Sequence, residues 1–92
     1  MIRSFRGRRA ERLHNGERVR EYQSFSRQAE KRLRILDAAD RLEALAMLPG
    51  NQLEALRGDR RGQHSIRINE QWRLCFVWKS DGPHEVEIVD YH

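Results

Sequence analysis

The chain has 92 residues, which is enough for one hydrophobic core, and we expect a single domain over residues 1–92. An active site enclosed between two domains is thereby excluded. Charged residues make up 35% of the chain and apolar residues 38%, yet two Trp, two Tyr and three Phe are too many aromatic residues for a disordered tail.

The net charge of +4 is distributed unevenly. Residues 1–35 contain eleven basic residues against four acidic ones, a net charge of +7, whereas residues 36–92 contain seven against ten, a net charge of −3. Sixteen of the 18 basic residues are Arg, which suits bidentate phosphate contacts and base stacking. This pattern favours a polyanionic partner, with RNA, DNA and an acidic protein all allowed, although GC-rich coding would also enrich Arg.

Several classes of protein do not fit the sequence. The single Cys75 excludes an intramolecular disulfide, and no apolar run is long enough for a signal peptide or a membrane span. Cys and His show no zinc-binding spacing, and no glycine-rich phosphate loop is present. We expect a cytoplasmic protein with no metal, no cofactor and no membrane association.

The N-terminal third starts with a short apolar alternation. Residues 2–5 alternate apolar and polar side chains and predict a first strand. Residues 6–21 are rich in Arg and Glu, with a turn at Asn15-Gly16. They form either a short helix around residues 8–14 or a basic arm that becomes ordered on a partner.

A helical period begins at Ser26, a suitable N-cap. One apolar stripe contains Phe25, Ala29, Leu33 and Leu36, and a second contains Ile35, Ala39, Leu42 and Ala46. The segment from Asp37 to Asp40 can divide the region into a long and a short helix, and Pro49-Gly50-Asn51 ends it.

The period changes to two in the C-terminal part. Residues 65–69, 72–78 and 86–91 predict three strands, joined by turns at residues 70–71 and 80–83. The expected fold class is α+β: an N-terminal strand, a helical segment and a three-stranded antiparallel meander. Its helices pack on one face of the sheet and leave the other face free for a ligand.

Strand alternation separates the candidate functional side chains. His64 lies on the same face as Ile66 and Ile68, which favours a packed histidine over a catalytic one. Arg73 lies on the opposite face of the central strand. A buried guanidinium without a partner would cost several kcal/mol, so Arg73 must face solvent, an anionic ligand or an acidic side chain, for which Glu87 is the alternative on the next strand.

The chain ends in Asp90-Tyr91-His92, three groups that can transfer protons or stack on a base. A histidine with a pKa near about 6.5 can act as acid or base at neutral pH, and a nearby carboxylate can orient it. The alternative is an ordinary solvated terminus.

A larger set of spaced residues carries a family resemblance. It comprises Met1 to Phe5, Leu36 to Ala39, Leu56-Arg57-Gly58-Asp59-Arg60, Gly62, Ser65 to Asn69, Gln71 to Trp78, and Val86 to His92. With this set the chain resembles the HigB-type toxins of the RelE/ParE superfamily, the toxin halves of bacterial type II toxin–antitoxin systems. The resemblance is strong over residues 50–92, and residues 6–34 match only in type.

The resemblance implies a small RelE-like fold and a specific activity. That activity is ribosome-dependent cleavage of translated mRNA by metal-independent acid–base chemistry, which inhibits translation and growth. It also implies a cognate helix-turn-helix antitoxin of the HigA type, with operator DNA bound only through the antitoxin.

The resemblance also assigns roles to individual residues. Arg73 matches the phosphate-stabilising arginine, Asp90 and His92 match the acid–base and positioning residues, and Tyr91 matches a residue that stacks on a base or orients the phosphate. The predicted RNA-binding residues are Arg57, Arg60 and Arg67. One position departs from the family, because Glu54 stands where some members have a histidine. A carboxylate can act as a base there but repels the phosphate, so catalysis either rests on His92 or is slow, and weak toxicity is one expectation.

Two alternatives remain open from the sequence. The first is a non-nucleolytic inhibitor that binds the ribosome, an assembly intermediate or DNA gyrase. The second concerns the antitoxin, which either covers the catalytic face or binds the basic surface of residues 6–34.

Overall fold

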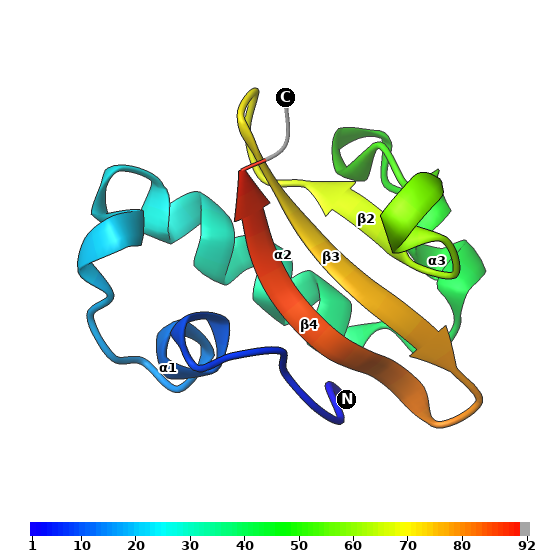
Figure 1. Cartoon of the computed structure of the whole chain (residues 1–92), viewed down its shortest axis with the longest axis horizontal. Helices are drawn as coiled ribbons and strands as arrows, with labels where there is room; N and C mark the ends of the chain where they lie inside the picture. Colours follow the sequence, from blue (N-terminus) through cyan, green and yellow to red (C-terminus); the bar gives the residue numbers. More distant parts are fainter. Residues whose placement is uncertain (91–92) are drawn as a thin grey trace.

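The computed structural model describes residues 1–90 (Figure 1). In chain order its elements are α1 (Arg9–His14), the 3-10 turn η1 (Arg20–Phe25), α2 (Ser26–Ala38), α3 (Leu42–Ala46), η2 (Pro49–Asn51), β1 (Glu54–Ala55), η3 (Gly58–Arg60), β2 (His64–Arg67), β3 (Trp72–Lys79) and β4 (Gly82–Asp90). The predicted α+β class is confirmed.

The sheet is antiparallel, with the strand order β1-β2-β3-β4. The predicted meander corresponds to β2, β3 and β4, in which Leu74 is paired with Ile66 on one side and with Ile88 on the other. β1 is an additional strand of two residues that pairs only with Ser65 and His64. Beyond Ser65, β2 is therefore an edge strand.

The N-terminal segment lies beside β4 but does not form the predicted strand. Its contacts with β4 are a parallel bridge between Phe5 and Val86 and a few backbone hydrogen bonds, such as Arg3 N to Pro83 O at 2.8 Å. Glu85, next to Val86, has a left-handed φ of 52°, which interrupts the extended backbone that a continuous ladder requires. The segment is thus held along β4 without extending the sheet.

Residues 9–14 form a helix, so the helical alternative for the basic segment is confirmed. α1 buries Ala10 and Leu13 and packs against α2 and β4. In α2 the first predicted stripe is buried throughout: Phe25, Ala29, Leu33 and Leu36. The N-cap position is Phe25 rather than Ser26, which is already helical, and Phe25 makes no side-chain capping hydrogen bond.

The helical region divides where the sequence predicted, because α2 ends at Ala38 and α3 begins at Leu42. The break resets the helical phase. As a result α3 buries Leu45, whereas Ala46, which the second stripe had placed inward, is exposed.

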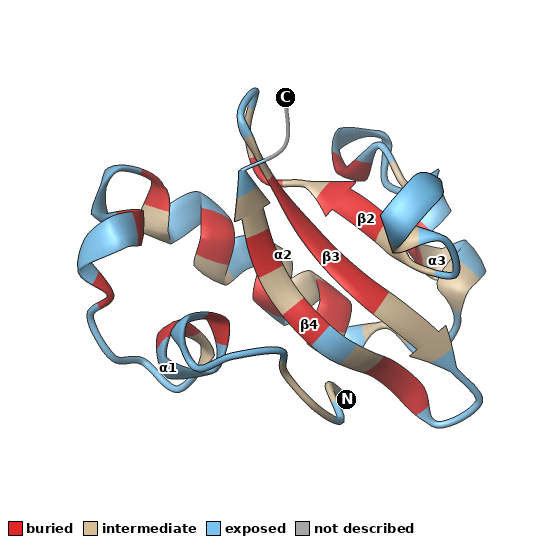
Figure 2. Ribbon diagram, in the orientation of Figure 1, coloured by how far each residue is buried: buried red, intermediate tan, exposed pale blue. Residues whose placement is uncertain are grey.

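The two faces of the sheet are covered differently. α2 crosses behind β3 and β4 in Figure 1 and packs against their apolar face, on which Leu74, Phe76 and Val86 are fully buried. Figure 2 shows buried residues of both faces in red along these strands. The prediction that the other face is free was wrong for part of that face, where Ser65, Arg73 and Cys75 are at most 7% exposed, whereas Arg67 on the same face is only half-buried. Residues 49–60 fold back onto it: the carbonyl of Gln52 contacts Arg73, and the side chain of Arg60 reaches β4.

Candidate functional site

Arg73 is the most buried charged residue among those described, at 7% exposed. It lies near the start of β3, on the face opposite α2. Its Nε donates to Ser65 Oγ at 2.7 Å, and its Nη2 donates to the carbonyl of Gln52 and, at 3.4 Å, to that of Ser65. All three acceptors are neutral, so the guanidinium is held in place while its charge is not neutralised by these contacts.

The backbone around Gln52 shapes one wall of the site. Gln52 follows η2 and adopts a left-handed conformation with φ 44° and ψ 57°. A non-glycine residue in this region carries strain of about 1 kcal/mol or more. This conformation occurs where the chain turns from η2 toward β1, and the carbonyl of Gln52 there accepts a hydrogen bond from Arg73.

Nη1 of Arg73 is directed toward an acidic side chain. Within residues 1–90 it makes no hydrogen bond and forms an ion pair of 4.0 Å with Glu54 Oε1. The Glu54 side chain is 53% exposed, so this pair is of the weak, solvent-screened kind. A phosphate can therefore compete with Glu54 for Nη1 of Arg73.

An open hollow of about 420 Å³ surrounds these groups. It is lined by residues of β1, β2, β3 and the turns beside them: Gln52, Glu54, Arg67, Asn69, Glu70 and Arg73. The lining is mostly polar, and it contains two arginines and two carboxylates. Such an open, polar hollow suits part of a charged chain better than a small apolar ligand.

Arg67 and Arg73 are direct partners across β2 and β3. Side chains at paired positions point to the same face, with Cβ atoms about 4.5–5.5 Å apart, and like charges at such positions are unfavourable. Arg67 is only half-buried and lines the hollow beside Arg73. Two adjacent guanidinium groups at a concave surface attract an anion.

The alternative prediction, an ion pair between Arg73 and Glu87, was wrong. Glu87 is paired in register with Cys75, and its carboxylate binds Arg60 Nη1 at 2.7 Å and lies 3.9 Å from Arg6 Nη1. The hydrogen bond to Glu87 raises the pKa of Arg60, whose Nη1 also donates to Gln63. Arg60, predicted to bind RNA, is thus engaged within the protein.

Arg57, the remaining predicted RNA-binding residue, does not line the hollow at Arg73. It occupies the N-cap position of η3 in an extended conformation and is exposed. Its role stays a prediction.

Asp90 ends β4 on the other face of the sheet from Arg73. It is the register partner of Trp72, whereas Arg73 is paired with Val89, so alternation places the two charged residues on opposite faces. The Asp90 carboxylate accepts a hydrogen bond from Gln71 Nε2 at 3.0 Å. Tyr91 and His92, predicted as catalytic, lie outside the described residues. Within residues 1–90 the structure therefore brings Arg73, Arg67 and Glu54 together and does not place Asp90 beside them.

Cysteine and histidine side chains can act in catalysis, but Cys75 and His64 contribute to packing instead. Burial raises the pKa of the Cys75 thiol to about 11, which keeps it protonated and unreactive at neutral pH. His64 stacks on Phe76 with ring centroids 6.3 Å apart, and the prediction of a packed histidine is confirmed.

Sequence reasoning missed Ser65 and Gln52, the two residues that hold Arg73. Strand alternation already placed Ser65 on the face of Arg73, so that signal was available. Nothing in the sequence marks Gln52, because its contact is made by the backbone carbonyl.

Residues 1–90 contain neither a metal-binding cluster nor a membrane-spanning helix. No group of three or more His, Cys, Asp or Glu side chains there is arranged to hold a metal ion. No helix in the same part of the chain is long and apolar enough to cross a membrane.

Comparison with known proteins identifies similar sequences. A family model described as RelE-like toxin of the type II toxin-antitoxin system HigB matches residues 3–92. Toxin HigB-1 of Vibrio cholerae serotype O1 is 48% identical over 48 residues. That match covers 52% of this chain and 50% of the relative, so the chain aligns with about half of the relative's length.

Proposed function

The chain belongs to the RelE-like HigB toxins of type II toxin–antitoxin systems, and from this premise we propose that it is an endoribonuclease that cleaves mRNA on the ribosome and so inhibits growth. The observation that carries the proposal is the guanidinium of Arg73. It is nearly buried, held by neutral acceptors, and directed at an open hollow lined by polar groups. Such a fixed positive charge suits stabilisation of a phosphate whose charge increases during a reaction.

The proposed reaction needs no group beyond side chains and the RNA itself. The 2′-oxygen of one nucleotide attacks the adjacent phosphorus, and the bond from phosphorus to the 5′-oxygen of the next nucleotide breaks. A base removes the proton of the 2′-hydroxyl, and an acid donates a proton to the departing 5′-oxygen. The products are a 2′,3′-cyclic phosphate and a 5′-hydroxyl. Arg73 stabilises the negative charge of the pentavalent transition state.

The proton transfers are assigned to the C-terminal residues. His92 can act as base or acid near neutral pH, Asp90 positions or assists it, and Tyr91 stacks on a base or orients the phosphate. Glu54 is within 4.0 Å of Arg73, but an ionised carboxylate there repels the substrate phosphate. We therefore assign Glu54 to modulation of phosphate binding, which supports a slow reaction.

The open shape of the site supports the proposal that another molecule positions the mRNA for cleavage. The hollow of about 420 Å³ is open, and residues 1–90 form no deep cleft around Arg73. Proximity and orientation supply a large part of an enzyme's rate enhancement, so the mRNA must be positioned by something else. A ribosome that holds mRNA in its decoding site meets this requirement, and the exposed Arg57 can bind the RNA backbone.

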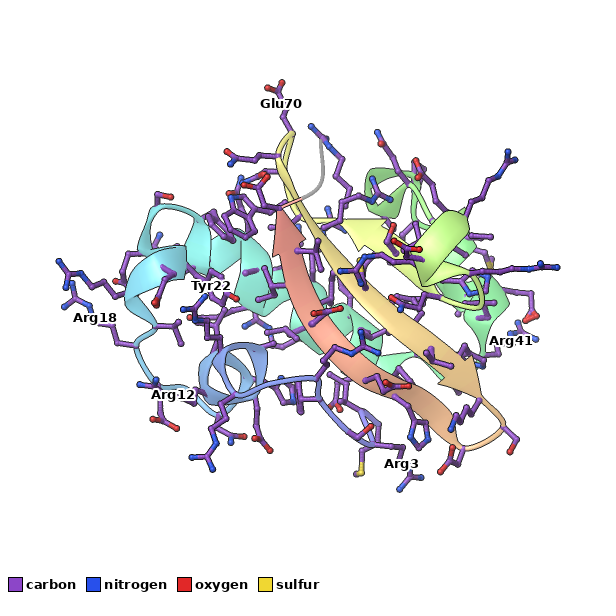
Figure 3. The ribbon with its side chains drawn as sticks, viewed as in Figure 1. Arg3, Arg12, Arg18, Tyr22, Arg41 and Glu70 are labelled. Carbon is purple, nitrogen blue, oxygen red and sulfur yellow. The ribbon has the colours of Figure 1, made fainter. Side chains whose placement is uncertain are left out.

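Mapping of RNA ends after induction tests the proposal. Primer extension on translated mRNA is expected to show new 5′ ends within codons for the unaltered chain. These ends should be strongly reduced in Arg73→Ala and His92→Ala. Arg41→Ala should retain them, because Arg41 is exposed (labelled in Figure 3) and does not line the hollow at Arg73. Growth arrest with intact mRNA would instead favour non-nucleolytic inhibition, and accumulation of cleaved DNA complexes would indicate gyrase.

A cognate antitoxin is the second part of the proposal. We infer that a helix-turn-helix antitoxin binds the basic N-terminal surface and leaves the hollow at Arg73 open. Arg8, Arg18 and Arg20 are exposed and form no ion pair within residues 1–90, and Arg18 projects from the molecule in Figure 3. An acidic segment of the antitoxin would find unpaired cations there. Protection of residues 6–34 from hydrogen exchange on antitoxin binding is expected, and protection confined to the sheet would contradict this docking mode.

A further inference from the structure

A second open hollow, of about 430 Å³, adjoins the one at Arg73. Its walls come from α2 and from the end of β2 with the turn that follows: Gln28, Lys31, Arg32, Arg67, Ile68, Asn69 and Glu70. Arg67, Asn69 and Glu70 line both hollows. The two hollows therefore adjoin at these three residues, and together they are called the depression.

The two hollows adjoin at the edge of β2, which β1 is too short to cover. β1 pairs only with Ser65 and His64, so no strand covers the edge of β2 at Arg67. The Arg67 side chain at this free edge lines both hollows. Arg67 thereby connects the face that carries Arg73 with the face on which α2 lies.

Three guanidinium groups follow this path. Arg73 and Arg67 are register partners, and Arg67 is close enough to Arg32 to help lower its pKa, an effect caused mainly by burial of Arg32 and secondly by the charge of Arg67. Arg32 donates to Asn51 Oδ1, a neutral acceptor, and Asn51 is itself fixed by a hydrogen bond of 3.0 Å to the carbonyl of Leu45. The protein thus holds like charges close together without an ion pair between Arg32 or Arg67 and a carboxylate within residues 1–90.

The acidic groups of the depression lie at its margins. Glu70 projects away from the molecule at the tip of the β2–β3 turn (Figure 3), and Glu54 is beside Arg73 in the first hollow only. The second hollow also contains the exposed Lys31. The second hollow therefore has a net positive charge.

On these grounds, and resting on the proposed function, we propose that Arg32 and Lys31 on α2, together with Arg67, form a second phosphate subsite. It binds a phosphate that neighbours the one at Arg73, so that the RNA strand crosses the free edge of β2 toward α2. The subsite serves to align the strand and takes no part in the chemical step. Positive grooves that track a single strand in this way bind without sequence preference.

Short RNA analogues of different length test the subsite. The unaltered chain, labelled with 15N, is titrated with 2′-O-methyl oligoribonucleotides, which lack the attacking hydroxyl, and binding is followed by NMR, which detects millimolar affinities. A dinucleotide contains one phosphate between its nucleosides and can occupy only one subsite, whereas a tetranucleotide contains three. We expect tighter binding of the tetranucleotide, with chemical-shift changes at residues of both hollows.

Two variants that touch only the second hollow provide the comparison. Arg32→Gln is expected to weaken binding of the tetranucleotide about tenfold and Lys31→Gln about two- to threefold, each with the dinucleotide changed less than twofold. Each lost phosphate contact should also reduce the slope of log affinity against log salt by about 0.7. Lys31 is exposed, so Lys31→Gln keeps the test valid if the loss of the bond to Asn51 destabilises Arg32→Gln.

Arg34→Gln is the matched control, since Arg34 is an exposed arginine of α2 that lines neither hollow. It should change both affinities less than twofold. The subsite is refuted if both variants weaken the dinucleotide and tetranucleotide equally, if Arg34→Gln has as large an effect, or if the tetranucleotide causes no shift changes around Arg32. None of these results depends on cleavage in the cell, whereas the proposed function fails if the unaltered chain leaves mRNA intact.

Discussion

Substitution of Glu54 tests whether its carboxylate competes with the substrate phosphate for Arg73. Its carboxylate lies 4.0 Å from Nη1 of Arg73 and would compete with a substrate phosphate for the same guanidinium. Glu54→Gln removes this competition and keeps the size of the side chain. We expect the variant to bind RNA more tightly and to cleave at least as fast as the unaltered chain.

The expected gain in phosphate binding follows from the solvent exposure of the ion pair between Glu54 and Arg73. The Glu54 side chain is 53% exposed, and exposed ion pairs contribute about 0.2–1 kcal/mol. Because about 1.4 kcal/mol corresponds to a factor of ten, removal of the carboxylate should raise phosphate binding about 1.4- to 5-fold. A larger gain would require a desolvated pair, which this degree of exposure excludes.

The assay is cleavage of a defined mRNA on purified ribosomes, at several toxin concentrations, so that binding and chemical steps are separated. Glu70→Gln is the matched control, since Glu70 lines the same hollow but projects away from the molecule (Figure 3). It should change the rate by less than the Glu54 variant does. A fall of a hundredfold or more in Glu54→Gln would refute this reasoning, because a loss of that size is typical of a missing general base.

Three further predictions concern the fold that supports the site. Ser65→Ala removes the acceptor of Arg73 Nε, and it should cost about 1–3 kcal/mol of unfolding free energy in urea titration and lower cleavage in parallel, whereas Ser65→Thr, which keeps a hydroxyl, should retain more of both. The hydrogen bond from Arg6 lowers the pKa of Glu85, so the stabilising effect of Glu85 is present above its ordinary pKa of 4.5 and is lost as pH falls through the lower folded value. The difference in Tm between the unaltered chain and Glu85→Gln should therefore be present at pH 7 and vanish in acid. A difference independent of pH would contradict this assignment. Cys75 is buried with a pKa of about 11, so iodoacetamide at pH 8 should alkylate it slowly in the native chain and rapidly in denaturant, and rapid native alkylation would contradict the burial.

Local patterns in the sequence predicted much of the sheet and of α2. Alternation over residues 65–69 and 72–78 depends only on which side chains face the core, and the α2 stripe of Ala29, Leu33 and Leu36 depends only on helical period. β1 was missed because two residues are too few to show a period.

The covering of the second face was missed for a different reason. It depends on an irregular segment in which Gln52 turns through a left-handed conformation, and no residue type there requires this geometry. The sequence therefore identified Arg73 as a charge in need of a partner, but not the backbone carbonyl that binds it.

The position of Asp90 relative to Arg73 required the register between strands. Alternation within one strand does not say which residue of the next strand lies opposite, and only the pairing of Trp72 with Asp90 separates the two charges onto different faces. The predicted roles of Tyr91 and His92 lie outside the described residues and remain predictions.

The chemistry of the cleaved ends tests the central proposal most directly. A defined mRNA on purified ribosomes is treated with the unaltered chain or with Arg73→Lys, and the 3′ product is labelled by polynucleotide kinase without prior phosphatase treatment. We predict cuts within codons that carry 5′-hydroxyl ends, strongly reduced in Arg73→Lys because a lysine cannot reproduce the bonds to Ser65 and Gln52 together with a free cationic donor. Intact mRNA, 5′-phosphate ends, or undiminished cleavage in Arg73→Lys would contradict the proposal.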